Sequence, residues 1–223
     1  MDFDKILEKI YNFYPPDPGL YKDDGFYKSS HGDKVHAAWE SQDEKTIWLP
    51  FVDKLNQQTG LDLITIYRGT EFCFKAYGNF TEFSADKYID TTIVVSVSTM
   101  VPFHSIYISQ RQDNKNSIRT FFDSNGNSVD FFEPCYTDEC KQVKEVVKQM
   151  NERQGITETL QKCSLKAEAV KIIKSISDIT AQNFKTTILP LDFINKQVDK
   201  IAVEDSFVGD VNIYTAAFTP HII

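Results

Sequence analysis

The sequence predicts an α+β fold in which an antiparallel meander sheet of about five to seven strands carries N- and C-terminal helices packed on it. Three observations predict it. Residues 61–133 contain successive short segments in which apolar and polar residues alternate. Short turns join these segments, which favours antiparallel neighbours over parallel crossovers. Apolar residues at helical spacing lie on both sides of the block, in residues 1–60 and 136–184.

Length and composition favour one folded domain over residues 1–223, with helices in 1–60, strands in 61–133, helices in 136–184 and a mixed tail in 185–223. The chain is 41% hydrophobic and 25% charged, which is ordinary globular usage. Its start lacks the positive charge of a signal peptide, and no segment has membrane-spanning length. Four cysteines without Cys-x-x-Cys spacing indicate free thiols. We therefore expect a cytoplasmic protein without membrane partners.

The first sixty residues predict helices separated by a long loop. Asp2 is the expected N-cap of the first helix, which ends before the prolines that begin at Pro15. A loop of Pro, Gly, Asp and aromatic residues follows. Residues 34–58 then show two helical faces, with Pro50 in the first turn of the second helix and Gly60 as its C-terminal cap.

Alternation predicts six strands in the central block. Gly69-Thr70 and Asn125-Gly126 have the composition of hairpin turns, and the second turn predicts that Phe122 faces Val129. Residues 78–90 show no clear pattern and are expected to be irregular. The predicted strands are residues 61–68, 71–77, 91–99, 103–110, 118–123 and 128–132.

The last third of the chain predicts helices and one final strand. Apolar stripes in residues 138–155 and 164–179 indicate two helices that cover one side of the sheet. Residues 191–201 continue the helical spacing of apolar residues. Residues 211–218 alternate, which predicts a last strand that joins the sheet.

The sequence contains no phosphate-binding glycine loop, nucleophile elbow or zinc-binding motif, so we assign no catalytic residue, metal ligand or cofactor. His31 and His36 are five residues apart, which does not align them on one helix face. His104 lies on a predicted strand face with isoleucines, which favours a hydrogen-bonded core or edge histidine over a general base. Glu71 and nearby acids are expected to be solvated strand ends.

The loop between the first two helices is the best candidate for binding a partner. Its aromatic rings offer large contact area at low entropic cost, its prolines limit disorder, and its aspartates attract a basic partner. The alternative is that the rings only pin a long connector to the core. The candidate partner-binding residues are Tyr14, Asp17, Tyr21, Asp23, Asp24, Phe26 and Tyr27.

Charge narrows the class of partner. The net charge is −8, and the acidic excess is largest at the start: residues 1–60 hold 11 acidic and 7 basic side chains, residues 61–133 hold 9 and 6, and the remainder hold 12 and 11. An acidic surface repels phosphate backbones, so we expect no nucleic-acid partner.

These features predict a protein-binding module that sequesters or neutralises a basic protein partner, in the manner of a toxin-immunity protein. Two alternatives stay open. One is a hydrolase or transferase in which scattered acids and His104 line a pocket. The other is a structural or secretion-associated homo-oligomer, because the sequence does not determine the oligomeric state.

Overall fold

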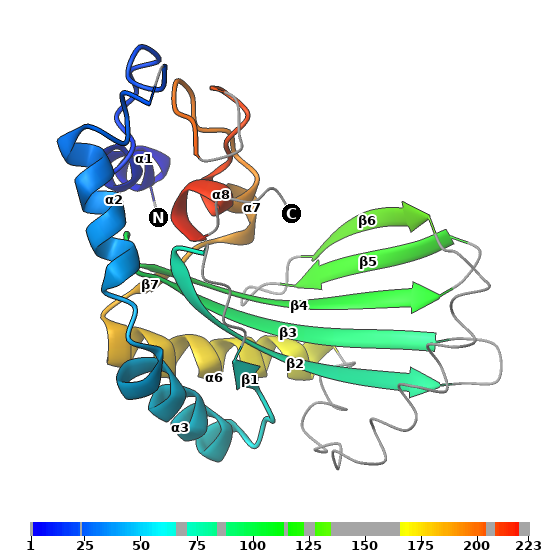
Figure 1. The fold of residues 1–223 in the computed structure, drawn as a ribbon. Coiled ribbons are helices and arrows are strands. Elements are labelled where there is room, and N and C mark those ends of the chain that lie inside the picture. The colour runs from blue at the N-terminus through cyan, green and yellow to red at the C-terminus, as the bar shows by residue number, and fades with distance from the viewer. Residues whose placement is uncertain are drawn as a thin grey trace.

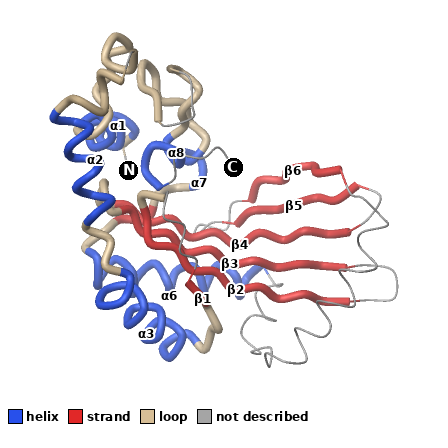
Figure 2. Tube along the Cα trace, viewed as in Figure 1, coloured by secondary structure: helices blue, strands red, loops and turns tan. Residues whose placement is uncertain are grey.

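The structure is a computed structural model that describes residues 2–22, 24–65, 71–83, 88–113, 116–122, 128–134, 166–203 and 208–218 (Figure 1). Its helices and strands confirm the α+β class (Figure 2). The helices are α1 (Phe3–Tyr11), α2 (Ser30–Glu40), the π-helical turn η1 (Glu44–Trp48), α3 (Leu49–Thr59), α6 (Lys166–Phe184), α7 (Leu191–Ile194) and α8 (Ile213–Phe218). The strands are β1 (Ile64–Thr65), β2 (Cys73–Phe83), β3 (Tyr88–Ser98), β4 (Phe103–Asp113), β5 (Asn116–Phe122), β6 (Ser128–Pro134) and β7 (Thr187–Ile188).

The sheet is mixed but mostly antiparallel. Its five long strands, β2 to β6, pair in chain order, and each is antiparallel to the next. Two-residue strands extend it: β1 pairs antiparallel with β2, and β7 pairs parallel with β4. The parallel β7 was not predicted, because it lies beyond a long helix and is too short to show alternation.

Two predictions inside the sheet were wrong. Residues 78–83 and 88–90 are not irregular, because β2 and β3 pair continuously from Cys73–Ser98 to Phe83–Tyr88. Cross-strand pairing overrides the low strand propensity of residues such as Gly78. In the last hairpin Val129 faces Phe121 rather than Phe122, a shift of one residue that exchanges the faces of the sheet. The two predicted turns themselves lie outside the described residues.

The N-terminal helices begin where side chains cap them. Asp2 accepts from the Asp4 N–H at 3.2 Å, and Ser29 accepts from the N–H groups of His31 and Gly32. The second helix therefore starts at Ser30, earlier than predicted. Gly32 is its only buried residue.

The predicted Pro50 and Gly60 positions at the two ends of α3 are confirmed, and Gly60 adopts the left-handed conformation with φ 68°. The π-helical turn η1 before α3 was not predicted. It results from a five-residue hydrogen bond between the Leu49 N–H and the Glu44 carbonyl.

The tail differs from its prediction. The helical spacing over 191–201 yields only the short α7, because the chain then pairs with a distant segment: Gln197 forms an antiparallel bridge with Asn212, and the Val198 N–H donates to the Val211 carbonyl. Residues 213–218 form α8 instead of a strand. Asn212 caps this helix by accepting from the Thr215 N–H at 2.8 Å, and burial of every residue of α8 removes the polar face that would reveal a helix.

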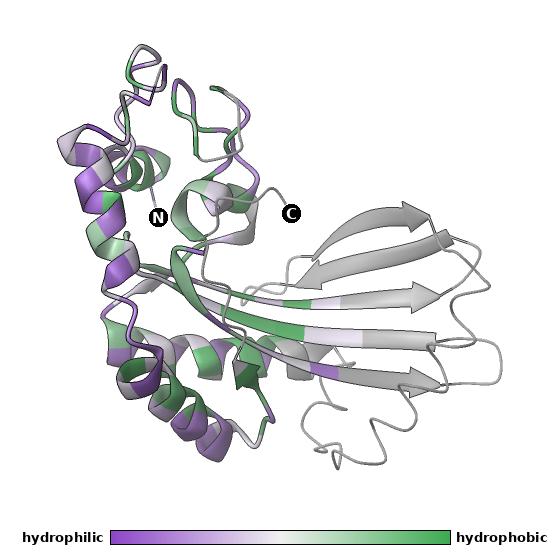
Figure 3. Cartoon of the chain, viewed as in Figure 1, coloured by the Kyte–Doolittle hydropathy of each residue, from purple (hydrophilic) through white to green (hydrophobic). Residues whose placement is uncertain are grey.

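Two groups of buried side chains lie between the sheet and the helices. The first packs α3 and α6 against one face, with Trp48, Leu55, Val95 and Ile176 at its centre. The second joins α1, α7 and α8 to the starts of β2 and β4. Figure 3 shows hydrophobic colours in the middle of β3 and mainly hydrophilic colours along α2. The helix predicted at 164–179 is confirmed as part of α6, whereas that at 138–155 lies outside the described residues. Among the described helices, none has the length and apolar content needed to cross a membrane.

Candidate functional site

The predicted binding loop, residues 14–27, is anchored in the core by two of its own rings. Tyr14 and Phe26 are buried, and their rings stack with centroids 5.5 Å apart. Tyr21 also stacks on Phe26, with centroids 5.3 Å apart, and donates its hydroxyl to the Pro15 carbonyl. Burial raises the pKa of the half-buried Tyr21. For Tyr14 and Phe26, the expectation of an outward orientation was wrong, because packing these rings stabilises the fold of the long connector.

Three of the candidate binding residues are exposed, Asp17, Asp24 and Tyr27, and the same loop also exposes Lys22. Tyr27 is 60% exposed, although its ring touches Phe26 edge to face at 5.7 Å. Asp17 accepts a hydrogen bond from the Gly19 N–H at 2.9 Å, a turn bond that leaves the carboxylate in water. Asp24 occupies a turn with φ 59°. Asp23 lies outside the described residues.

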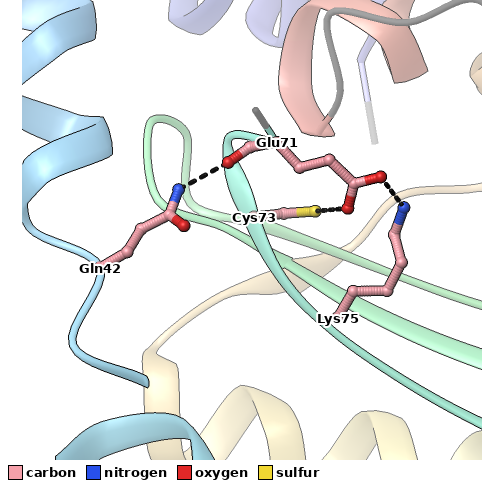
Figure 4. Close-up of polar contacts among 4 residues, drawn as sticks. All are labelled: Gln42, Glu71, Cys73 and Lys75. Atoms are coloured by element: carbon pink, nitrogen blue, oxygen red, sulfur yellow. Dashed lines mark hydrogen bonds and ion pairs between the residues drawn. The ribbon is translucent and has the colours of Figure 1, made fainter. Parts of the chain in front are cut away.

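A buried polar cluster at the start of β2 was missed by the sequence reasoning (Figure 4). The Lys75 ammonium donates to the Glu71 carboxylate at 2.8 Å, and both side chains are buried. The Cys73 thiol lies 3.9 Å from the same carboxylate. Glu71 is therefore not the solvated strand end that was predicted. Burial raises the pKa of Cys73 to about 12 and outweighs the opposing effect of Lys75, so the thiol stays protonated and is a poor nucleophile.

Three buried hydroxyls lie in the same layer, those of Ser96, Ser105 and Tyr214, and Ser96 interacts with the Cys73 thiol and the Tyr214 hydroxyl. The strand register places Lys75, Ser96 and Ser105 side by side across β2, β3 and β4. Tyr214 comes from α8, and burial raises its pKa well above the usual value. A sequence signal was present, since Lys75, Ser96 and Ser105 are polar residues inside otherwise apolar strands, but only the register brings them together.

His104 is a hydrogen-bonded core histidine, as predicted. Its ring nitrogens lie 2.9 Å from the Thr186 hydroxyl and 3.0 Å from the Ser177 hydroxyl, and the residue is fully buried. Burial lowers its pKa to about 4, so it is neutral at pH 7. Both of these hydrogen-bond partners are hydroxyls rather than the carboxylate that would orient a general base.

The two other histidines of interest point to different partners. The His31 Nδ1 lies 3.3 Å from the Asn12 carbonyl, whereas the His36 Nδ1 lies 3.5 Å from the Glu40 carboxylate. Their separation agrees with the argument from helix spacing. Among the described residues, no group of three or more His, Cys, Asp or Glu side chains is arranged to hold a metal ion.

Comparisons of this chain with protein-family models, curated proteins and solved structures found no match.

Proposed function

We propose that this chain is an acidic binding module that sequesters or neutralises a basic protein partner, in the manner of an immunity protein. Its contact residues are the exposed members of the predicted set, Asp17, Asp24 and Tyr27. The proposal rests on the burial pattern of the loop. Its buried rings hold the backbone in place, while an exposed ring and two exposed carboxylates lie on its surface.

Anchoring favours binding for a physical reason. A long loop that is disordered when free loses conformational entropy when it binds, and this loss weakens the complex. Here Phe26 stacks with the rings of both Tyr14 and Tyr21, so much of that entropy has already been lost on folding. An exposed tyrosine beside such an anchor adds contact area with little further ordering.

Charge sets the class of partner. Residues 1–60 carry 11 acidic and 7 basic side chains, so the part of the chain that contains the loop is the most acidic. Complementary charge increases the association rate and disfavours acidic competitors. The expected partner is therefore a protein with a basic surface that faces the loop.

The proposal is tested by affinity capture with the full chain as bait, followed by calorimetric titration of the purified captured protein. The loop variant Asp17→Asn/Asp24→Asn/Tyr27→Ala is compared with Asp53→Asn/Asp62→Asn, which removes the same number of exposed charges elsewhere. We expect a basic protein to bind the wild type and the control but not the loop variant. Capture of no basic protein, or equal binding by all three chains, contradicts the proposal. Mass measurement in solution distinguishes it from a homo-oligomer.

A further inference from the structure

We propose that the rings of Phe3 and Phe193 form a binding site for a cationic side chain of the basic partner, and that Lys196 occupies this site in the free protein. The site lies where α1 meets α7, outside the predicted loop. This inference rests on the proposed function and extends it, because the partner's lysine or arginine must displace a lysine of this chain.

Two half-buried rings from distant parts of the chain form the site. Phe3 is the first residue of α1, and Phe193 belongs to α7. Their rings stack with centroids 5.9 Å apart and planes 15° apart. Both rings pack against the second group of core side chains, yet neither residue is fully buried. The pair is therefore fixed by the fold and still partly in contact with solvent.

A cation already lies over these rings. The Lys196 ammonium is 4.9 Å from the centroid of Phe3 and 4.4 Å from the centroid of Phe193. Both distances are within the limit of about 6 Å for a cation–π interaction, in which the negative face of a ring attracts a positive charge. The ring pair thus has the geometry to hold an ammonium or guanidinium group.

The side chain of Lys196 is held by these rings alone. Within the described part of the chain, its ammonium forms no ion pair with a carboxylate. Its backbone is fixed separately, since its N–H donates to the Phe193 carbonyl and its carbonyl accepts from the Ile213 N–H at 3.0 Å. The ammonium can therefore leave the rings by rotation of its own side chain, without movement of α7.

The position of Lys196 favours its displacement by a partner. Lys196 is exposed, and a cation–π contact that remains in water is weak. The same contact becomes stronger when the cation is shielded from water, as happens inside an interface. A lysine or arginine of the partner would therefore bind the rings more strongly than Lys196 does.

Helix α1 connects the ring pair to the loop of the proposed function. Phe3, Leu7 and Tyr11 follow one another at intervals of four residues, which places them on one side of the helix, and all three are half-buried. Tyr11 lies beside the loop: burial raises the pKa of Tyr21, and the charges of Asp17 and Tyr11 add to this effect. The eight residues from Phe3 to Tyr11 span about 12 Å, which an interface of about 800 Å² on each partner can cover.

The first test uses tetramethylammonium chloride as a probe and follows the aromatic NMR signals of Phe3 and Phe193. In Lys196→Gln the rings lose their own cation, so we expect saturable shifts of both signals and an apparent affinity at least about 3-fold above that of wild type. Equal concentrations of sodium chloride should not produce these shifts. The control Lys5→Gln removes another exposed lysine near the site and should respond as wild type does.

The second test titrates the captured basic protein against the same chains. Lys196→Gln and Lys5→Gln each lose one positive charge, but only the first loses the competing cation. We therefore expect Lys196→Gln to bind about 3-fold more tightly than Lys5→Gln. Phe3→Leu/Lys196→Gln keeps an apolar side chain in α1 without its aromatic ring and should lose this gain. Urea unfolding of each variant confirms that the fold is retained.

The outcomes separate the two proposals. Shifts of both rings with the probe, together with the gain in partner affinity, support the cation site. Rings that do not respond, or equal partner affinities of Lys196→Gln and Lys5→Gln, overturn the cation site and leave the proposed function standing, because that function depends on the loop variant. Capture of no basic protein overturns the proposed function, and the probe titration then still decides whether the rings bind a cation.

Discussion

The loop of residues 14–27 and the sheet face beneath α8 contain the same kinds of residue in opposite environments. In the loop, Asp17, Asp24 and Tyr27 are exposed to water. Beneath α8, Glu71 and Lys75 are buried as an ion pair, and the hydroxyl of Tyr214 is buried beside Ser96.

This difference shows that residue type alone does not assign a role. A charge in water keeps its hydration and is available to a partner, whereas a buried charge depends on the group that neutralises it. Substitutions should therefore affect stability strongly at the buried sheet face and weakly at the exposed positions of the loop.

The largest effect is expected at the buried ion pair. Replacing Lys75 by Met leaves the Glu71 carboxylate buried without its cation, which should lower the free energy of unfolding by about 3–5 kcal/mol. Chemical denaturation measures this loss. The exposed pair His36–Glu40 has the same sequence spacing, and Glu40→Gln should change stability by less than about 0.5 kcal/mol. Equal losses at both pairs would remove the contrast between the regions.

Adjacent rings of the loop provide the next comparison. Phe26→Ala removes a buried ring and should cost about 3 kcal/mol or more, because the cavity is lined by Tyr14 and Tyr21. Tyr27→Ala removes an exposed ring and should change stability by no more than about 0.5 kcal/mol. Thermal and urea unfolding of the two variants measure the difference. A large loss at Tyr27 would show that this ring serves the fold and would weaken the binding proposal.

The buried His104 predicts a loss of stability in acid. Its pKa is about 4 in the folded chain and 6.5 as the reference value for the unfolded chain. Between these values the unfolded chain binds a proton that the folded chain does not, so stability is complete above about pH 6.5 and falls as the pH drops towards 4. The full effect is about 3 kcal/mol. The slope of unfolding free energy against pH should be smaller in His104→Gln than in wild type, and identical slopes would contradict the assignment.

The smallest effect is expected where the loop meets α2. Gly32→Ala places a methyl group against backbone atoms of the loop, and the resulting shift should cost about 1 kcal/mol even after the gain in helix propensity. Ala37→Ser, on the exposed side of the same helix, should cost only a few tenths of a kcal/mol. Urea unfolding compares them. An increase in stability for Gly32→Ala would show that the loop is not pressed against α2.

Several features of the fold follow directly from local sequence. Asp2, Pro50 and Gly60 mark the ends of helices for local reasons: the Asp2 side chain accepts a backbone N–H of the first turn, proline needs no N–H partner in a first turn, and Gly60 adopts the left-handed conformation that closes a helix. The mostly antiparallel sheet follows from alternation and short connections. The His104 environment also followed, since an imidazole on an isoleucine face is most often buried and hydrogen-bonded.

The candidate site was predicted only in part. The sequence located the aromatic and acidic loop, but could not tell Phe26, which is buried, from Tyr27, which is exposed. Both rings are equally compatible with either position in a loop that lacks periodicity.

By itself, the sequence determined the α+β class, the acidic N-terminal charge, the start of α1 and both ends of α3, because these depend on local backbone preference and composition. Only the tertiary structure decided the register that pairs Phe121 with Val129, the helical state of α8 and the burial of Glu71 with Lys75. These features depend on contacts between residues distant in the chain or on complete burial. Neither produces a periodic pattern of apolar and polar residues within the segment concerned.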